Sequence, residues 1–132
     1  MKTLIVEDES TSRLLLQSIL SGYGDCDIAT DGEEAVEAFK SALEHGAPYD
    51  LVCMDIMMPK LDGHQALARI RGIEKERSVP AQKAVKVVMT TALGDPKNVV
   101  KALYGEGAGS YLVKPIGKQK LLEELRCLGL IE

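Results

Sequence analysis

Cysteine is scarce in this sequence, at three residues in 132. Cys26, Cys53 and Cys127 lie far apart, are odd in number and include no Cys-x-x-Cys spacing, a poor pattern for either a disulfide framework or a zinc site. Because Cys53 lies inside an apolar run, we expect its side chain to be buried as a small hydrophobic group. Disulfide and zinc chemistry are therefore not expected.

Long hydrophobic runs and an excess of basic residues are also missing. The first apolar run ends at Glu7 and is too short for a signal peptide, and no run approaches the roughly 18 residues of a membrane span. The formal net charge is −4, with the acidic residues dispersed along the chain, which argues against nucleic acid as a direct partner. We therefore expect a cytoplasmic protein that contacts neither membrane nor nucleic acid directly.

Short apolar runs alternate with segments of helical spacing along the whole chain. Strands are predicted at residues 4–6, 26–30, 50–55, 85–90 and 111–113. Helices are predicted from apolar positions between residues 14 and 20, 36 and 43, 66 and 70, 99 and 103, and 121 and 128. Five strands alternating with five helices require a parallel sheet covered on both faces, the doubly wound α/β class.

Chain length and segment boundaries predict one domain over residues 1–132, with no effector domain and no internal repeat. The start at Met1 and a complete final helix favour a whole gene product. Asp31 followed by Glu34 approaches a capping box for the second helix. Residues 72–84 are charged and contain Pro80, which predicts a helix end followed by a long loop.

Polar residues stand at the carboxyl ends of four predicted strands, which meet at one edge of a parallel sheet. They are Glu7 and Asp8, then Asp55, then Thr90 and Thr91 with the small Ala92, and finally Lys114. Three neighbouring carboxylates repel one another unless a cation lies between them, and Mg²⁺ accepts carboxylate, water and phosphate oxygens. A lysine supplies a point charge for phosphate, so the pattern predicts a phosphoryl-transfer site.

The same residues resemble the response-regulator receiver family of two-component systems. The resemblance is carried by Glu7-Asp8, the run from Asp55 to Pro59 with Asp62-Gly63, Thr91-Ala92, and Lys114-Pro115. It implies a flavodoxin-like five-stranded sheet of order 2-1-3-4-5. It also implies that Asp55 accepts a phosphoryl group from a sensor histidine kinase or phosphotransfer protein.

The resemblance further implies a Mg²⁺ cofactor. Asp8 and Asp55 would bind the ion directly, the backbone carbonyl of Met57 would be a third ligand, and Glu7 would act through a water molecule. Met57 would also shield the acyl phosphate from water.

Other roles implied by the resemblance concern the phosphate and the switch. Lys114 would pair with the acyl phosphate, and Thr91 would donate a hydrogen bond to a phosphoryl oxygen. Ala92 would leave room for the phosphate. Tyr111 would turn inward when Thr91 moves, although a half-buried aromatic without this role remains the alternative.

The predicted function is a stand-alone phosphorylation switch that catalyses only its own phosphorylation and dephosphorylation. Its output surface would be the fourth helix, fifth strand and final helix, contacting a partner or a second copy, so the protein would be a monomer or a phosphorylation-dependent dimer. Alternatives are a phosphorelay intermediate, a receiver used only for binding, and a Mg²⁺-dependent phosphohydrolase. The last would need, in the haloacid-dehalogenase type, an acid where Met57 stands.

Overall fold

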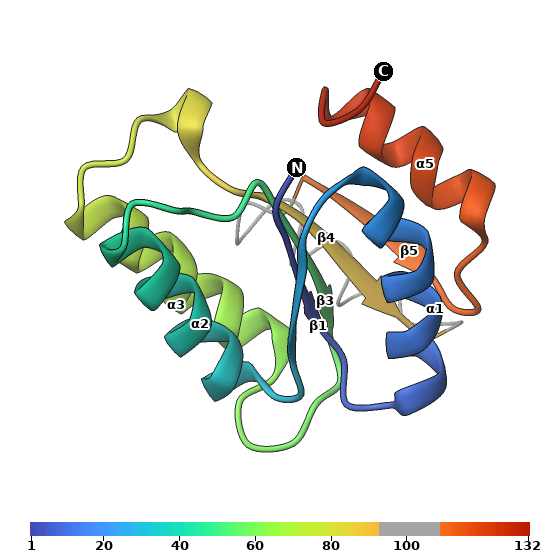
Figure 1. Ribbon diagram of the computed structural model, residues 1–132. Helices are drawn as coiled ribbons and strands as arrows, with labels where there is room; N and C mark the ends of the chain where they lie inside the picture. Colours follow the sequence, from blue (N-terminus) through green and yellow to red (C-terminus); the bar gives the residue numbers. More distant parts are fainter. Residues whose placement is uncertain (93–108) are drawn as a thin grey trace.

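The fold is built on five parallel strands in the order β2-β1-β3-β4-β5 (Figure 1). A computed structural model describes residues 1–92 and 109–132, so the helix predicted between residues 99 and 103 lies outside the described part. The strands are β1 (Thr3–Val6), β2 (Cys26–Ala29), β3 (Leu51–Asp55), β4 (Lys86–Thr91) and β5 (Ser110–Val113). This order is the flavodoxin-like one, and it confirms the predicted fold class.

Helices cover both faces of the sheet, in three layers (Figure 1). The described helices are α1 (Ser10–Leu20), α2 (Gly32–Glu44), α3 (Gly63–Glu76) and α5 (Lys118–Cys127), with short 3-10 turns at Ser21–Tyr23 and Ala81–Lys83. α2 and α3 pack on one face, and α1 and α5 pack on the other. In the described ranges, no helix combines the length and the apolar character needed to cross a membrane.

Two of the three inner strands, β1 and β3, are buried along their whole length. Their side chains alternate between the two apolar cores: Leu4 and Met54 face α2 and α3, whereas Ile5 and Cys53 face α1 and α5. Burial on both faces explains why these strands are continuous apolar runs. The burial of Cys53, as predicted, follows from this position.

The strand register aligns the carboxyl ends that carry the polar residues. Val6 pairs with Met54, and Asp55 pairs with Thr90, so Glu7 follows β1 at the level where β3 ends in Asp55. Lys114 follows β5 and is held at the same level by a hydrogen bond of 2.8 Å from its backbone N–H to the Thr91 carbonyl. Parallel pairing therefore brings the polar residues that follow the strands together at one edge of the sheet.

The capping box predicted at the start of α2 does not form in full. Asp31 caps α2 by accepting a hydrogen bond of 2.8 Å from the Glu34 N–H, but the Glu34 carboxylate accepts from the Thr30 N–H, so no capping box forms there. The reciprocal pair forms instead at α3, between Asp62 and Gln65.

Residues 72–84 contain the predicted helix end and long loop, but α3 continues beyond Gly72 as far as Glu76 before the loop begins. The reason is Glu74, a buried carboxylate that accepts hydrogen bonds from the Arg71 guanidinium at 2.6 Å and from the Val85 N–H at 2.7 Å. These bonds fasten the end of α3 to the start of β4. A charged pattern alone does not reveal a buried acceptor, so the sequence prediction missed it.

Candidate functional site

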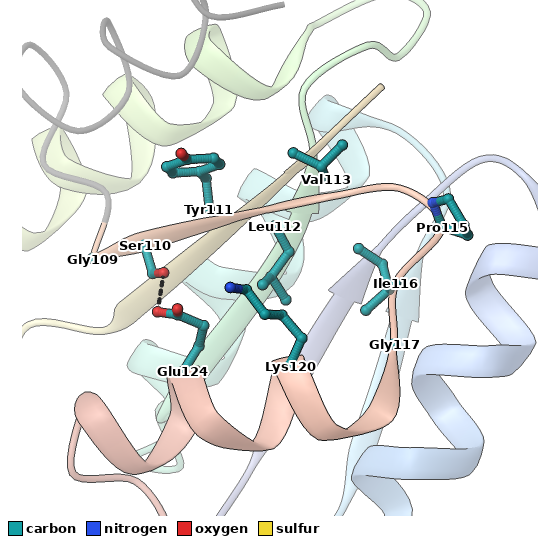
Figure 2. Close-up of a pocket in the computed structure, with 10 residues that line it drawn as sticks. All are labelled: Gly109, Ser110, Tyr111, Leu112, Val113, Pro115, Ile116, Gly117, Lys120 and Glu124. Carbon is teal, nitrogen blue, oxygen red and sulfur yellow. Dashed lines mark hydrogen bonds between the residues drawn. The ribbon is translucent and has the colours of Figure 1, made fainter. Parts of the chain in front are cut away.

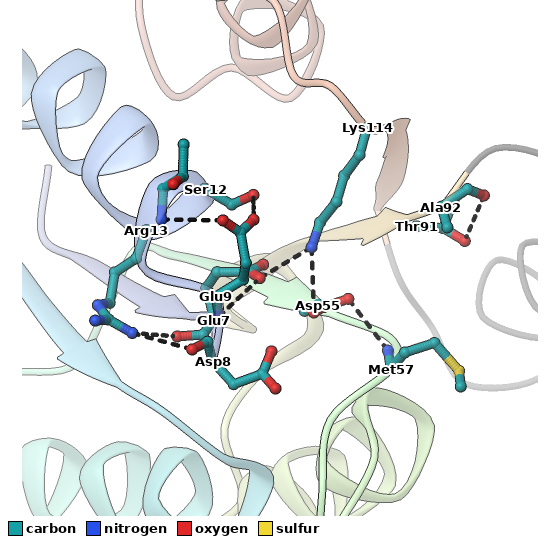
Figure 3. A network of polar contacts seen from close by, with 11 residues as sticks. Glu7, Asp8, Glu9, Ser12, Arg13, Asp55, Met57, Thr91, Ala92 and Lys114 are labelled. Atoms are coloured by element: carbon teal, nitrogen blue, oxygen red, sulfur yellow. Dashed lines mark hydrogen bonds and ion pairs between the residues drawn. The ribbon is translucent and has the colours of Figure 1, made fainter.

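Three carboxylates converge at the carboxyl edge of the sheet (Figure 3). One oxygen from each of Glu7, Asp8 and Asp55 can be chosen so that all lie within 4.8 Å of one another. Glu7 is fully buried and Asp55 is 5% exposed, whereas Asp8 is exposed. The second Glu7 oxygen, Oε2, is buried without a hydrogen-bond partner among residues 1–92 and 109–132.

This arrangement fits a hard divalent cation. Oxygen ligands at such spacing suit Mg²⁺, which binds through one or two carboxylates and keeps several waters. A buried carboxylate oxygen without a donor is expensive to leave unpaired, and a cation or its water would satisfy it. The donor set therefore agrees with the predicted magnesium site.

Lys114 reaches into the carboxylate cluster from the end of β5 (Figure 3). Its Nζ lies 2.9 Å from Glu7 Oε1 and 3.2 Å from Asp55 Oδ2. Burial alone would lower the pKa of Lys114, but the hydrogen bond to Glu7 and the charges of Asp55 and Glu7 together raise it. Lys114 is therefore a firmly charged group that links the two buried acids.

The pKa of Glu7 is raised from 4.5 to about 7. Burial is the main cause, because it removes the carboxylate from water. The hydrogen bond from Lys114 opposes this rise, and the negative charge of Asp55 adds to it. A metal-free site thus holds Glu7 on the border between its neutral and charged forms near neutral pH.

Asp55 is fixed by the loop that follows β3. Its Oδ1 accepts a hydrogen bond of 3.1 Å from the Met57 N–H, and the Ile56 carbonyl accepts one of 2.8 Å from the Gly63 N–H. A side chain at Gly63 would meet the Asp55 carbonyl oxygen at 2.5 Å, so only glycine allows α3 to start this close to β3. The Met57 side chain is 64% exposed at the rim.

The threonines at the end of β4 occupy different surroundings. Thr91 is buried, and its hydroxyl donates to the Ala92 carbonyl at 3.3 Å, not to Asp55. The Thr90 hydroxyl is buried without a partner in the described part of the chain. Tyr111 lies away from this cluster, 40% exposed on β5. The structure therefore brings together Glu7, Asp8, Asp55 and Lys114, with Thr91 on the neighbouring strand.

Tyr111 belongs to a separate hollow of about 600 Å³ between β5 and α5 (Figure 2). Val113 and Lys120 line it as well. The Ser110 hydroxyl donates a hydrogen bond to the Glu124 carboxylate, and both residues line the hollow, so this bond joins the strand to the helix. This surface coincides with the strand and final helix of the predicted output face.

One contact of the site was not anticipated. Arg13, in the first turn of α1, donates from Nη1 to the carbonyl oxygens of Glu7 at 3.1 Å and Asp8 at 3.4 Å (Figure 3). A basic residue one helical turn after an acidic loop is the only sequence signal that could have indicated it.

The family is shown by comparison with known proteins. The family model described as "Response regulator receiver domain" matches residues 3–126. The chain belongs to this family. It is a receiver domain of two-component signalling.

Individual relatives agree with this membership. The receiver domain is 40% identical over 126 residues to "Chemotaxis protein CheY" of Treponema pallidum, covering 94% of this chain and 79% of that protein. Other relatives are longer: the chain spans only 44% of the "Probable transcriptional regulator ycf27" of Guillardia theta, at 39% identity.

Solved structures agree as well. One is the receiver domain of the sensor histidine kinase PA1611 from Pseudomonas aeruginosa, with a magnesium ion in its active site cleft (27% identity, TM-score 0.76, 97% of both chains). Another is the Saccharomyces cerevisiae receiver domain of Ssk1 in complex with the histidine phosphotransfer protein Ypd1. It is 29% identical with a TM-score of 0.81, over 99% of this chain and 92% of that one.

Proposed function

We propose that Asp55 accepts a phosphoryl group from a phosphohistidine of a sensor kinase or phosphotransfer protein, in a Mg²⁺-dependent reaction. The observation that carries this proposal is the contact of Lys114 with both Glu7 and Asp55, beside three carboxylates whose oxygens lie within 4.8 Å. Phosphoryl transfer needs little covalent chemistry from the protein. It needs groups that position the reactants and neutralise charge, and these residues supply both.

In the proposed reaction, one Asp55 carboxylate oxygen attacks phosphorus in line. The new O–P bond forms an acyl phosphate as the N–P bond to the donor imidazole breaks, and the imidazole leaves with that electron pair. Lys114 stays paired with the charge that develops on the phosphoryl oxygens. Bound Mg²⁺, held by Asp8, Asp55 and the Met57 carbonyl with Glu7 acting through water, would neutralise charge on those oxygens.

Thr91 is the residue whose hydrogen bond would change when Asp55 is phosphorylated. Its hydroxyl donates to the adjacent Ala92 carbonyl, a bond it can exchange for a phosphoryl oxygen because the small Ala92 leaves space. That exchange would draw the end of β4 toward Asp55. Tyr111, exposed on the neighbouring strand, would turn inward and change the surface formed by β5 and α5.

The protein that donates the phosphoryl group would cover the carboxyl edge of the sheet beside α1. A mainly apolar hollow of about 390 Å³ there is lined by Leu15, Pro115 and Ile116 together with Lys114. Asp55 is only 5% exposed, so the phosphohistidine of the donor must come close to the carboxyl edge of the sheet. The donor protein must then contact the surface around this edge. The complex of the Ssk1 receiver domain with Ypd1 supports a phosphotransfer protein as the kind of partner.

Two functions are compatible with this chemistry, and they differ in where the phosphoryl signal goes next. A switch changes its partner or dimer contacts on phosphorylation, whereas a phosphorelay intermediate passes the group to a second histidine. A phosphohydrolase is less well supported, because Met57, with no acidic group, stands where a general acid would be needed.

The test is phosphorylation by a phosphohistidine donor with Mg²⁺, measured by intact-protein mass spectrometry. The wild type should gain one phosphoryl group, and Asp55→Asn should gain none. Asp31→Asn is the matched control, because it alters another aspartate after a strand while keeping a residue that caps α2. Uptake by Asp55→Asn equal to the wild type would refute the proposal, and release of many phosphates per chain would indicate the hydrolase.

A further inference from the structure

Arg13 is a partly buried cation that contacts the backbone of the turn carrying Glu7 and Asp8, and no hydrogen bond joins it to their carboxylates. It contacts backbone oxygens: one nitrogen, Nη1, donates to the carbonyls of Glu7 at 3.1 Å and Asp8 at 3.4 Å. Its own N–H donates to the Glu9 carbonyl at 3.0 Å as α1 begins. The Arg13 side chain therefore holds the carbonyls of Glu7 and Asp8, next to the backbone bond to Glu9 with which α1 begins.

The turn matters because little else fixes the direction of Asp8. Over residues 1–92 and 109–132, the Asp8 carboxylate takes part in no hydrogen bond or ion pair. Glu7 is better held, by its N–H to the Ala29 carbonyl at 3.0 Å and by Lys114. The position of the Asp8 carboxylate within the cluster thus depends on the backbone that Arg13 holds.

We propose that Arg13 is a positioning residue for the metal site, which fixes the turn after β1 so that the Asp8 and Glu7 carboxylates face Asp55. This inference rests on the magnesium site of the proposed function. Groups behind a metal ligand orient it, and their loss commonly lowers metal affinity about 10- to 100-fold. Because Arg13 acts through two carbonyls and touches none of the three carboxylates, we expect the low end of that range.

The test measures Mg²⁺ binding by isothermal titration calorimetry in the full chain. Arg13→Met keeps much of the aliphatic length but removes the charge and the donors, and it should raise the Mg²⁺ dissociation constant about tenfold. Arg13→Lys keeps a charge and one donating group without the planar fork, so its dissociation constant should lie between those of Arg13→Met and the wild type.

Arg69→Met is the matched control, because Arg69 is an exposed arginine on α3 and its loss removes the same charge. It should leave the dissociation constant within about twofold of the wild type, since exposed charges at a distance are screened. In metal-free protein, the amide ¹⁵N shifts of Asp8 and Glu9 should change in Arg13→Met and stay unchanged in Arg69→Met. A general loss of stability would not produce this local pattern.

The outcomes separate this inference from the proposed function. If the wild type binds no Mg²⁺, the metal site fails and the role of Arg13 fails with it. If the wild type binds Mg²⁺ and Arg13→Met binds equally well, or Arg69→Met loses as much affinity, only the positioning role is overturned. Urea unfolding confirms that each variant is folded, and Arg13→Lys carries the test if Arg13→Met is not.

Discussion

Replacement of Glu7 by glutamine should make the metal-free protein more stable at neutral and alkaline pH, although Glu7 belongs to the site. Glu7 is fully buried, and its pKa is raised to about 7 chiefly because burial disfavours the charged form. Glutamine has nearly the same shape and resembles the protonated acid. It therefore removes the cost of ionising this group inside the fold.

The size and sign follow from the pKa values. Below the ordinary value of 4.5, Glu7 is protonated in both folded and unfolded chains, and its neutral form is well accommodated. As the pH rises from 4.5 to about 7, the unfolded chain ionises while the folded chain retains the proton, so stability is lost. With about 1.4 kcal/mol for each pKa unit, the loss approaches about 3 to 4 kcal/mol and becomes constant only well above the folded-state pKa of about 7.

The assay is urea unfolding followed by circular dichroism, in EDTA, for the wild type and Glu7→Gln across this pH range. The free energies of unfolding should agree near pH 4.5 and diverge in favour of the variant as the pH rises. Saturating Mg²⁺ should reverse the order at high pH, because the cation binds the ionised wild type better. A difference that is independent of pH in EDTA would refute the reasoning.

Further predictions concern other buried or charged groups. Glu74→Ala should lower the free energy of unfolding by about 3 kcal/mol, since it removes a buried acceptor of two hydrogen bonds, whereas Glu76→Ala, exposed on the same helix, should change it by less than about 0.5 kcal/mol in urea unfolding. Lys114→Met should tighten Mg²⁺ binding several-fold in calorimetry, because the ammonium group competes with the cation for the same carboxylates; weaker binding would contradict this. An alkylating reagent should modify Cys127 in the native protein but Cys53 only after unfolding, as judged by mass spectrometry, because Cys53 is buried and its pKa is raised to about 12.

Local signals in the sequence anticipated much of the fold. Continuous apolar runs predicted β1 and β3, because a central parallel strand is covered on both faces. Alternation with helical spacing predicted the doubly wound class, and the residues after each strand predicted a polar rim. The sequence did not show which backbone group the Glu34 and Glu74 carboxylates reach, because that choice depends on distant or neighbouring segments.

The sequence by itself determined which groups stand at the carboxyl edge, because strand direction and period are local properties. Only the tertiary structure decided how those groups interact. The bond from Lys114 to Glu7 spans 107 positions, and the pKa of Glu7 is raised by its burial in the folded protein. The Arg13 side chain likewise reaches the Glu7 carbonyl only because α1 folds back over the turn after β1. Desolvation and side-chain direction arise from packing, and no local pattern encodes them.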